Sequence, residues 1–219
     1  MKNNNQTLLE VYRRLFQRYG PQHWWPGDSP FEVMVGAILT QSTAWKNVEK
    51  SITNLKNAGV MSPMALRNIP TDEIANLIHP SGYYNAKTLK LQALVRWLGE
   101  SCGDDLDKLF ALDTDTLRLQ LLDVYGIGPE TADSILLYAA NKPVFVIDTY
   151  TRCIINRLGL APENNGYDAY RTLFTGNLPP NPRLFNEYHA LLVRLGKEAC
   201  RKQAICERCC LLDLCHRQV

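Results

Sequence analysis

Residues 125–160 read YGIGPETADSILLYAANKPVFVIDTYTRCIINRLGL, and this stretch decides the fold. Its first part predicts a helix, a tight turn at Gly126–Gly128 and a second helix. The two glycines allow the backbone to reverse with positive φ, Ile127 tucks inward, and Pro129 suits a first helical turn. Such a turn points N–H groups outward at a helix start, which suits a phosphate oxygen. A plain helical hairpin with glycines for packing is the alternative, because Gly-x-Gly is common.

Apolar residues recur at intervals of three to four nearly everywhere else in the chain, as they do in helices. The only run with β-branched character, 143–147 (PVFVI), is too short to found a sheet. We therefore expect an all-α protein. The predicted helical segments are 8–19, 31–41, 45–55, 71–78, 87–98, 116–124, 131–140, 149–158, 167–174 and 185–195.

Composition fits an ordinary folded domain, since 46% of the 219 residues are apolar and 21% are charged. The longest apolar stretch, Phe31 to Leu39, contains Glu32 and is too short to span a membrane. The N-terminus lacks the features of a signal peptide. We expect a cytoplasmic monomer with no membrane partner. The net charge of +2 does not by itself indicate nucleic acid.

Cysteine usage points to a bound metal or cluster. Seven cysteines cannot all pair, and five fall between residues 200 and 215. Without an export signal, a metal site is favoured over disulfides. Four thiolates in one short loop can ligate a [4Fe–4S] cubane or hold zinc, and spacing alone leaves both open. The proposed ligands are Cys200, Cys206, Cys209 and Cys215, with Cys210 as an alternative to Cys209; Cys102 and Cys153 look like ordinary buried thiols.

The stretch 125–160 resembles the endonuclease III superfamily of DNA glycosylases, whose signature is a helix-hairpin-helix, a Gly/Pro-rich loop and an aspartate. The resemblance extends upstream to LTQSTAWKNVEKSI at 39–52 and downstream to the cysteines. It implies two helical lobes, residues 28–141 with the hairpin and residues 1–27 plus 142–219 with the aspartate and the cysteine loop.

The same resemblance implies double-stranded DNA with a damaged base as the partner and a [4Fe–4S] cluster as the cofactor, although the first cysteine gap is one residue shorter than in endonuclease III. The cluster loop would place basic side chains on DNA, and a solvated basic tail is the alternative. The DNA-contacting residues implied are Gly126, Ile127, Gly128, Arg201, Lys202 and Arg208.

Asp148 matches the family's aspartate. Breaking an N-glycosidic bond builds positive charge on the sugar, and a nearby carboxylate stabilises that charge and orients the attacking water. The alternative is an N-cap, which aspartate also favours. Where strand-nicking members carry a Schiff-base lysine, this chain has Glu130. A carboxylate supplies no amine nucleophile, so we expect a monofunctional glycosylase without lyase activity.

The nearest branch by resemblance is the endonuclease III-related 3-methyladenine DNA glycosylases, which share the glutamate at position 130 and the motif His23-Trp24-Trp25-Pro26. Trp24, Trp25 and Trp45 then stack on a flipped, cationic base, or else fill the core. Gln41 corresponds to the residue that family members push into the gap left by that base, or is an exposed helix-end glutamine.

The same motifs also fit a glycosylase for a mismatched or an oxidised base. A third alternative is a DNA protein that binds lesions without chemistry. Glu130 argues against the strand-nicking pyrimidine type, and Asp148 argues against the pure binder.

Overall fold

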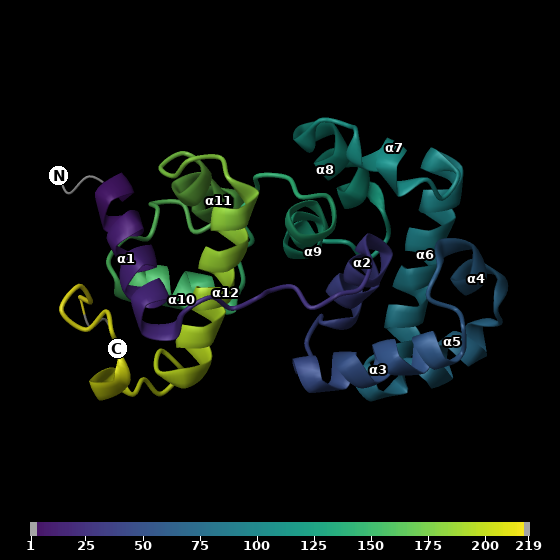
Figure 1. Cartoon of the computed structure of the whole chain (residues 1–219), viewed down its shortest axis with the longest axis horizontal. Helices are drawn as coiled ribbons and strands as arrows, with labels where there is room; N and C mark the ends of the chain where they lie inside the picture. The colour runs from purple at the N-terminus through teal and green to yellow at the C-terminus, as the bar shows by residue number, and fades with distance from the viewer. Residues whose placement is uncertain (1–3, 217–219) are drawn as a thin grey trace. The chain divides into compact units, whose positions relative to one another are not determined.

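The computed structural model describes residues 4–216 and, over that range, contains helices and no strand (Figure 1). The all-α prediction is therefore confirmed. The chain forms two compact units, one from Met1–Trp25 with Pro143–Val219 (unit 1) and one from Pro26–Lys142 (unit 2). No helix among the described residues is both long and apolar enough to cross a membrane.

Unit 2 is built around α2 (Pro30–Leu39), in which every residue after the first is buried. A short helix that is apolar on nearly every side belongs in a core, and α2 packs against α3, α6, α9 and η2. Ser29 caps its start by accepting the Glu32 N–H at 3.2 Å, and the buried Glu32 carboxylate pairs with Lys56 at 2.7 Å. The other elements of unit 2 are α3 (Trp45–Asn57), α4 (Pro63–Asn68), α5 (Thr71–Leu77), η1 (His79–Ser81), α6 (Tyr84–Cys102), α7 (Leu106–Phe110), α8 (Thr114–Asp123), α9 (Pro129–Ser134) and η2 (Ile135–Ala139).

Unit 1 contains α1 (Asn4–Tyr19), α10 (Thr149–Arg157), α11 (Tyr167–Thr175), α12 (Pro182–Glu198) and η3 (Cys206–Arg208), with α12 packed against both α1 and α10. Its core is aromatic. Phe145 stacks on Phe174 with ring centroids 3.8 Å apart and meets Tyr188 edge-on. The buried Tyr188 hydroxyl donates to the Leu8 carbonyl at 2.8 Å, which joins α12 to α1. Phe145 belongs to the PVFVI run, whose residues 144–147 are all buried and form neither a helix nor a strand.

Two short helices escaped the sequence prediction. Ser62 and Pro63 indicated only a chain break, whereas the Ser62 hydroxyl accepts the Ala65 N–H at 3.3 Å and starts α4. Asp105 likewise accepts the Lys108 N–H at 3.2 Å and starts α7. Serine and aspartate favour turns and helix caps alike, and these helices are too short to show an apolar period.

A buried ion pair joins α8 to α9 across the hairpin. The Asp133 side chain is 0% exposed, and Arg118 Nε donates to its Oδ1 at 2.7 Å from a side chain that is 11% exposed. Removing one partner of such a pair leaves a charge in the interior. The hairpin helices are thus held together by charge as well as by apolar contact.

We predict that Arg118→Ala lowers the free energy of unfolding by about 3–5 kcal/mol, because the Asp133 carboxylate stays buried while its cation is gone. The control is Arg171→Ala, whose partner Asp168 is 64% exposed. A surface pair of that kind contributes at most about 1 kcal/mol. Urea denaturation followed by circular dichroism measures both, and equal losses in the two variants would contradict the prediction.

Candidate active site

The predicted hairpin is present, but its two glycines differ. Ile127 is 4% exposed and its N–H donates to the Val124 carbonyl at 3.1 Å, so it points inward as predicted. Gly126 has φ +80°, and a Cβ there would lie 2.2 Å from Cγ of Lys90. Gly128 has φ −91° and ψ 177°, which any residue adopts, and the space around it is open. The prediction of positive φ at both positions was therefore wrong for Gly128.

Gln41 ties the hairpin turn to the end of α2. Its Nε2 donates to the Gly126 carbonyl at 3.1 Å and to Thr131 Oγ1 at 2.9 Å. Its Oε1 accepts from Lys90 Nζ, and the stem of Lys90 fills the space beside Gly126. Gln41 is half-buried. The alternative of an exposed helix-end glutamine is therefore wrong, and the side chain bridges two segments of unit 2.

Tyr83 is a candidate site residue that the sequence did not reveal. It is 74% exposed and lies in the left-handed region with φ 48°, an unusual conformation for a bulky residue. Lys87, which is 2% exposed, donates to the carbonyls of Leu39 at 2.8 Å and Ser81 at 2.7 Å. These bonds hold the segment before Tyr83 against the end of α2, the same end that Gln41 follows. Burial lowers the pKa of Lys87 to about 8, with a smaller effect from Lys90.

Asp148 is the N-cap of α10 in unit 1, one of the two roles that the sequence suggested for it. Its Oδ1 accepts the Thr151 N–H at 2.7 Å and caps α10. Its Oδ2 lies 3.8 Å from Nε2 of His189 on α12, and the Asp148 side chain remains 14% exposed. Burial lowers the pKa of His189, and the nearby Asp148 opposes that shift. His189 thus lies beside a carboxylate that solvent still reaches. His189 sits among apolar residues of α12, where the sequence offered no sign of a role.

The tryptophans fall into two groups. Trp24 and Trp25 are half-buried neighbours in unit 1, with ring centroids 5.4 Å apart and planes at 68°. Trp45 opens α3 in unit 2, and its Nε1 donates to Glu49 Oε1 at 2.8 Å. None of the three is fully buried, so core filling alone does not describe them. Glu130 is exposed in the first turn of α9.

The cysteine loop begins where α12 ends. Its five cysteines are half-buried and form no disulfide. Burial and, to a smaller extent, the nearby thiols of Cys210, Cys200 and Cys215 raise the pKa of Cys209 to about 11. Cys210 also borders a groove of about 440 Å³ lined by Arg13, Arg14, Gln17 and Arg18 of α1. Cys209 therefore stays the proposed ligand, with Cys210 as its alternative.

Within residues 4–216, no three His, Cys, Asp or Glu side chains converge tightly enough to hold one metal ion. A cubane distributes its four thiolates over four irons, so it does not require convergence on one point. Four half-buried thiols without disulfides fit that donor set.

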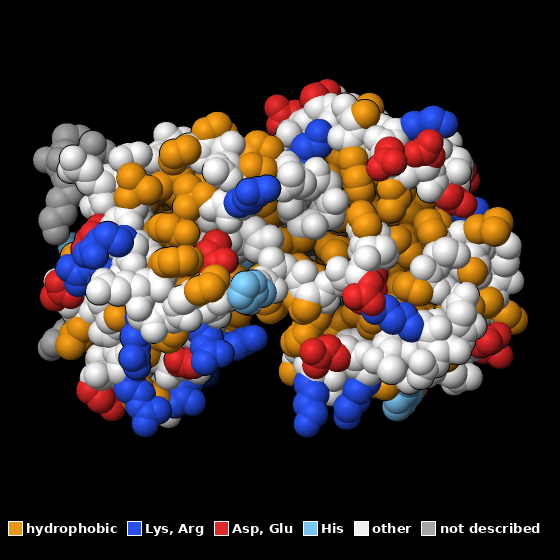
Figure 2. Space-filling model, viewed as in Figure 1, with side chains coloured by type: hydrophobic (Ala, Val, Ile, Leu, Met, Phe, Trp, Pro, Cys, Tyr) orange, Lys and Arg blue, Asp and Glu red, His pale blue; other side chains and the backbone are white. Residues whose placement is uncertain are grey.

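Arg201, Lys202 and Arg208 are exposed on the cysteine loop. Figure 2 shows Lys and Arg side chains gathered on unit 1 around the end of α12 and the loop that follows it. A basic surface of this kind suits phosphate contacts.

Comparison with known sequences gives consistent matches. The family model described as HhH-GPD superfamily base excision DNA repair protein matches residues 35–180. A Methanocaldococcus jannaschii protein named "Putative DNA repair glycosylase MJ1434" is 41% identical over 218 residues, which cover 98% of this chain and 99% of the relative. Endonuclease III of Thermotoga maritima is 28% identical over 95% of this chain and 92% of its own length.

Solved structures are similar as well. The 3-methyladenine DNA glycosylase MagIII of H. pylori, bound to 1,N6-ethenoadenine, aligns with a TM-score of 0.77 and 28% identity, covering 90% of this chain and 98% of that one. An endonuclease III–DNA complex aligns with a TM-score of 0.82 and 20% identity over 97% and 95% of the two chains. The latter identity is low enough that it shows the fold alone.

We predict that Gly126→Ala lowers the free energy of unfolding by about 1–2 kcal/mol, the usual cost of a Cβ in the left-handed region. The displacement of Lys90 adds to this cost. Gly128→Ala, at an extended and open position, should change the free energy of unfolding by less than about 0.5 kcal/mol. Urea denaturation of both variants tests the difference, and equal effects would show that the turn does not depend on the conformation of Gly126.

Proposed function

The chain belongs to the HhH-GPD superfamily of base excision DNA repair proteins, and from that premise we propose that it is a monofunctional DNA glycosylase for alkylated, 3-methyladenine-like bases. The observation that carries the proposal is the position of the Asp148 carboxylate. One of its oxygens caps α10, and the side chain is still 14% exposed. Glu130 stands where a lyase needs its lysine.

Asp148 supplies the chemistry. As the base leaves, positive charge develops on the sugar, and a fixed carboxylate stabilises that charge and orients water toward the sugar carbon. The Thr151 amide holds one carboxylate oxygen, so the side chain does not have to reorient as the charge appears. His189 packs beside the other oxygen at 3.8 Å and keeps that side of the group shielded.

The tryptophan pair supports a cationic substrate. An alkylated purine such as 3-methyladenine carries positive charge and is already a good leaving group, so it needs little acid assistance. A cation over an aromatic face gains up to about 2 kcal/mol when desolvated. Trp24 and Trp25 present such faces in unit 1. The likeness to MagIII, which is named a 3-methyladenine glycosylase and was solved with ethenoadenine, supports the same substrate class.

Unit 2 would bind the DNA backbone and stabilise the extruded conformation of the damaged nucleotide. The open space at Gly128 lets a phosphate oxygen approach the backbone of the turn, while Gly126 sets the turn's direction. Gln41 and Tyr83 both follow segments anchored at the end of α2. We propose that Gln41 leaves its bonds to the hairpin turn to enter the space left by a flipped base, and that Tyr83 stacks on a neighbouring base. Flipping costs a few kcal/mol, which such contacts offset in part.

A [4Fe–4S] cluster on Cys200, Cys206, Cys209 and Cys215 completes the proposal. When bound, the cluster would give the loop a rigid centre rather than take part in hydrolysis. The loop's own residues would then do the binding. Arg201, Lys202 and Arg208 are exposed on it and would contact phosphates of the duplex.

The proposal predicts release of an alkylated purine from DNA by the wild-type protein. Asp148→Asn should lower the rate by about 10²–10³-fold, because charge stabilisation is lost. Asparagine caps helices as well as aspartate does, so α10 and DNA binding should persist. A panel of lesion-bearing duplexes, with released bases identified by mass spectrometry, measures the activity, and fluorescence anisotropy measures binding.

Three outcomes of that assay would count against the proposal. Release of only a mismatched or oxidised base would overturn the substrate class. Equal release by Asp148→Asn would remove Asp148 from the chemistry. Lesion binding without release of any base would indicate a non-catalytic binder.

A second prediction concerns the lyase reaction. Wild-type protein incubated with abasic DNA and borohydride should give no covalent adduct on a denaturing gel, because the Glu130 carboxylate cannot form a Schiff base. Glu130→Lys places an amine at this exposed position and should produce a trapped adduct. A wild-type adduct would contradict the proposal, and testing Lys90→Ala would then ask whether the lysine beside Gly126 supplies the amine.

A further inference from the structure

Arg157, the last residue of α10, holds the start of the cysteine loop. Its Nη1 donates to Cys200 Sγ at 3.2 Å and to the Arg201 carbonyl at 2.8 Å. Its Nη2 donates to the Lys202 carbonyl at 3.4 Å. One guanidinium therefore engages three successive residues, the first of them a proposed cluster ligand.

The backbone of Arg157 holds the other end of the same loop. Its carbonyl accepts the His216 N–H at 2.9 Å and the Cys215 thiol at 3.2 Å. Between these two ends, the loop's own regular structure is limited to η3 and single turns. Arg157 thus fixes both boundaries of the segment that contains all four proposed ligands.

We propose that Arg157 is a positioning residue for the [4Fe–4S] cluster, an inference that rests on the proposed cofactor. Ligation replaces the thiol protons by iron and leaves negative charge on the sulfurs. A guanidinium N–H aimed at Cys200 Sγ stabilises that charge and orients the ligand, as hydrogen bonds to metal ligands generally do. Cys215 gives up its proton on ligation, and the His216 N–H still holds the Arg157 carbonyl.

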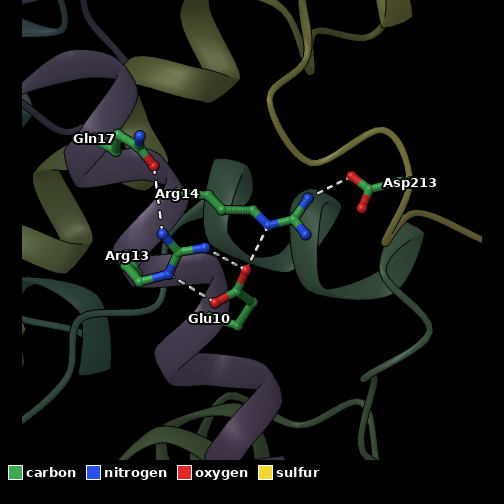
Figure 3. Close-up of polar contacts among 5 residues, drawn as sticks. All are labelled: Glu10, Arg13, Arg14, Gln17 and Asp213. Carbon is green, nitrogen blue, oxygen red and sulfur yellow. Dashed lines mark hydrogen bonds and ion pairs between the residues drawn. The ribbon is translucent and has the colours of Figure 1, made fainter.

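Arg14 provides a matched comparison, because it anchors the same loop without touching sulfur. It pairs with Asp213 on the loop, and its Nε donates to Glu10 Oε1 at 2.7 Å on α1 (Figure 3). Arg13 and Gln17 complete this network on α1. Losing Arg14 removes one anchor of the loop, whereas losing Arg157 removes an anchor and also the charged donor beside Cys200 Sγ.

The experiment compares Arg157→Gln, Arg157→Lys and Arg14→Gln in the full-length protein with its cluster. The readouts are the rate of iron release to a chelator and the reduction potential by protein-film voltammetry. We expect Arg157→Gln to release iron about 10–100-fold faster, the usual cost of losing such a partner, and to shift the potential to more negative values. Arg157→Lys keeps the charge without the planar fork and should recover part of both properties. Arg14→Gln should leave the potential unchanged.

Iron release and potential equal to wild type in Arg157→Gln would overturn the inference. Equal changes in Arg157→Gln and Arg14→Gln would also overturn it, since loop anchoring alone would then explain both. Wild-type protein without iron and sulfide would overturn this inference and the cofactor together. The base-release assay is independent of these readouts and judges the proposed glycosylase activity by itself.

Discussion

The hydrogen bond from the Thr151 amide to the Asp148 carboxylate is the constraint on which unit 1 depends. It fixes the carboxylate at the start of α10, a helix of nine residues and so about 13 Å long. The other end of that helix is Arg157, which contacts the cysteine loop. Because α10 packs against α12, which carries His189 and leads into Cys200, the carboxylate and the loop share one rigid support.

In unit 2, the end of α2 likewise supports two groups at once. The buried helix leads to Gln41, which donates a hydrogen bond to the hairpin turn. The carbonyl of Leu39, the last residue of α2, accepts from Lys87, which also holds the segment before Tyr83. The groups of unit 2 that would meet DNA are therefore short extensions of a fixed core, whereas the basic side chains of unit 1 lie on the cysteine loop. Sites built on rigid elements hold their geometry better than sites on mobile segments, and that suits an enzyme that must keep a strained DNA conformation.

The sequence predicted the features that are local in the chain. The hairpin, Asp148 as a helix cap and the family itself follow from residues close together, and comparison with known proteins confirms the family. Apart from the two short helices α4 and α7, what escaped prediction depends on distant partners. Gln41 bonds Gly126, 85 positions away, and His189 meets Asp148 only because two helices pack. The expectation for Gly128 failed because one positive φ, at Gly126, suffices to reverse the chain.

The most direct test of this account is a crystal structure of the Asp148→Asn variant bound to a duplex containing an alkylated purine. We predict that the damaged nucleotide is extruded, that its sugar lies beside the side chain at position 148, and that a backbone phosphate contacts the amides of the Gly126–Gly128 turn. A duplex bound with every base stacked, or with residue 148 remote from any sugar, would contradict it.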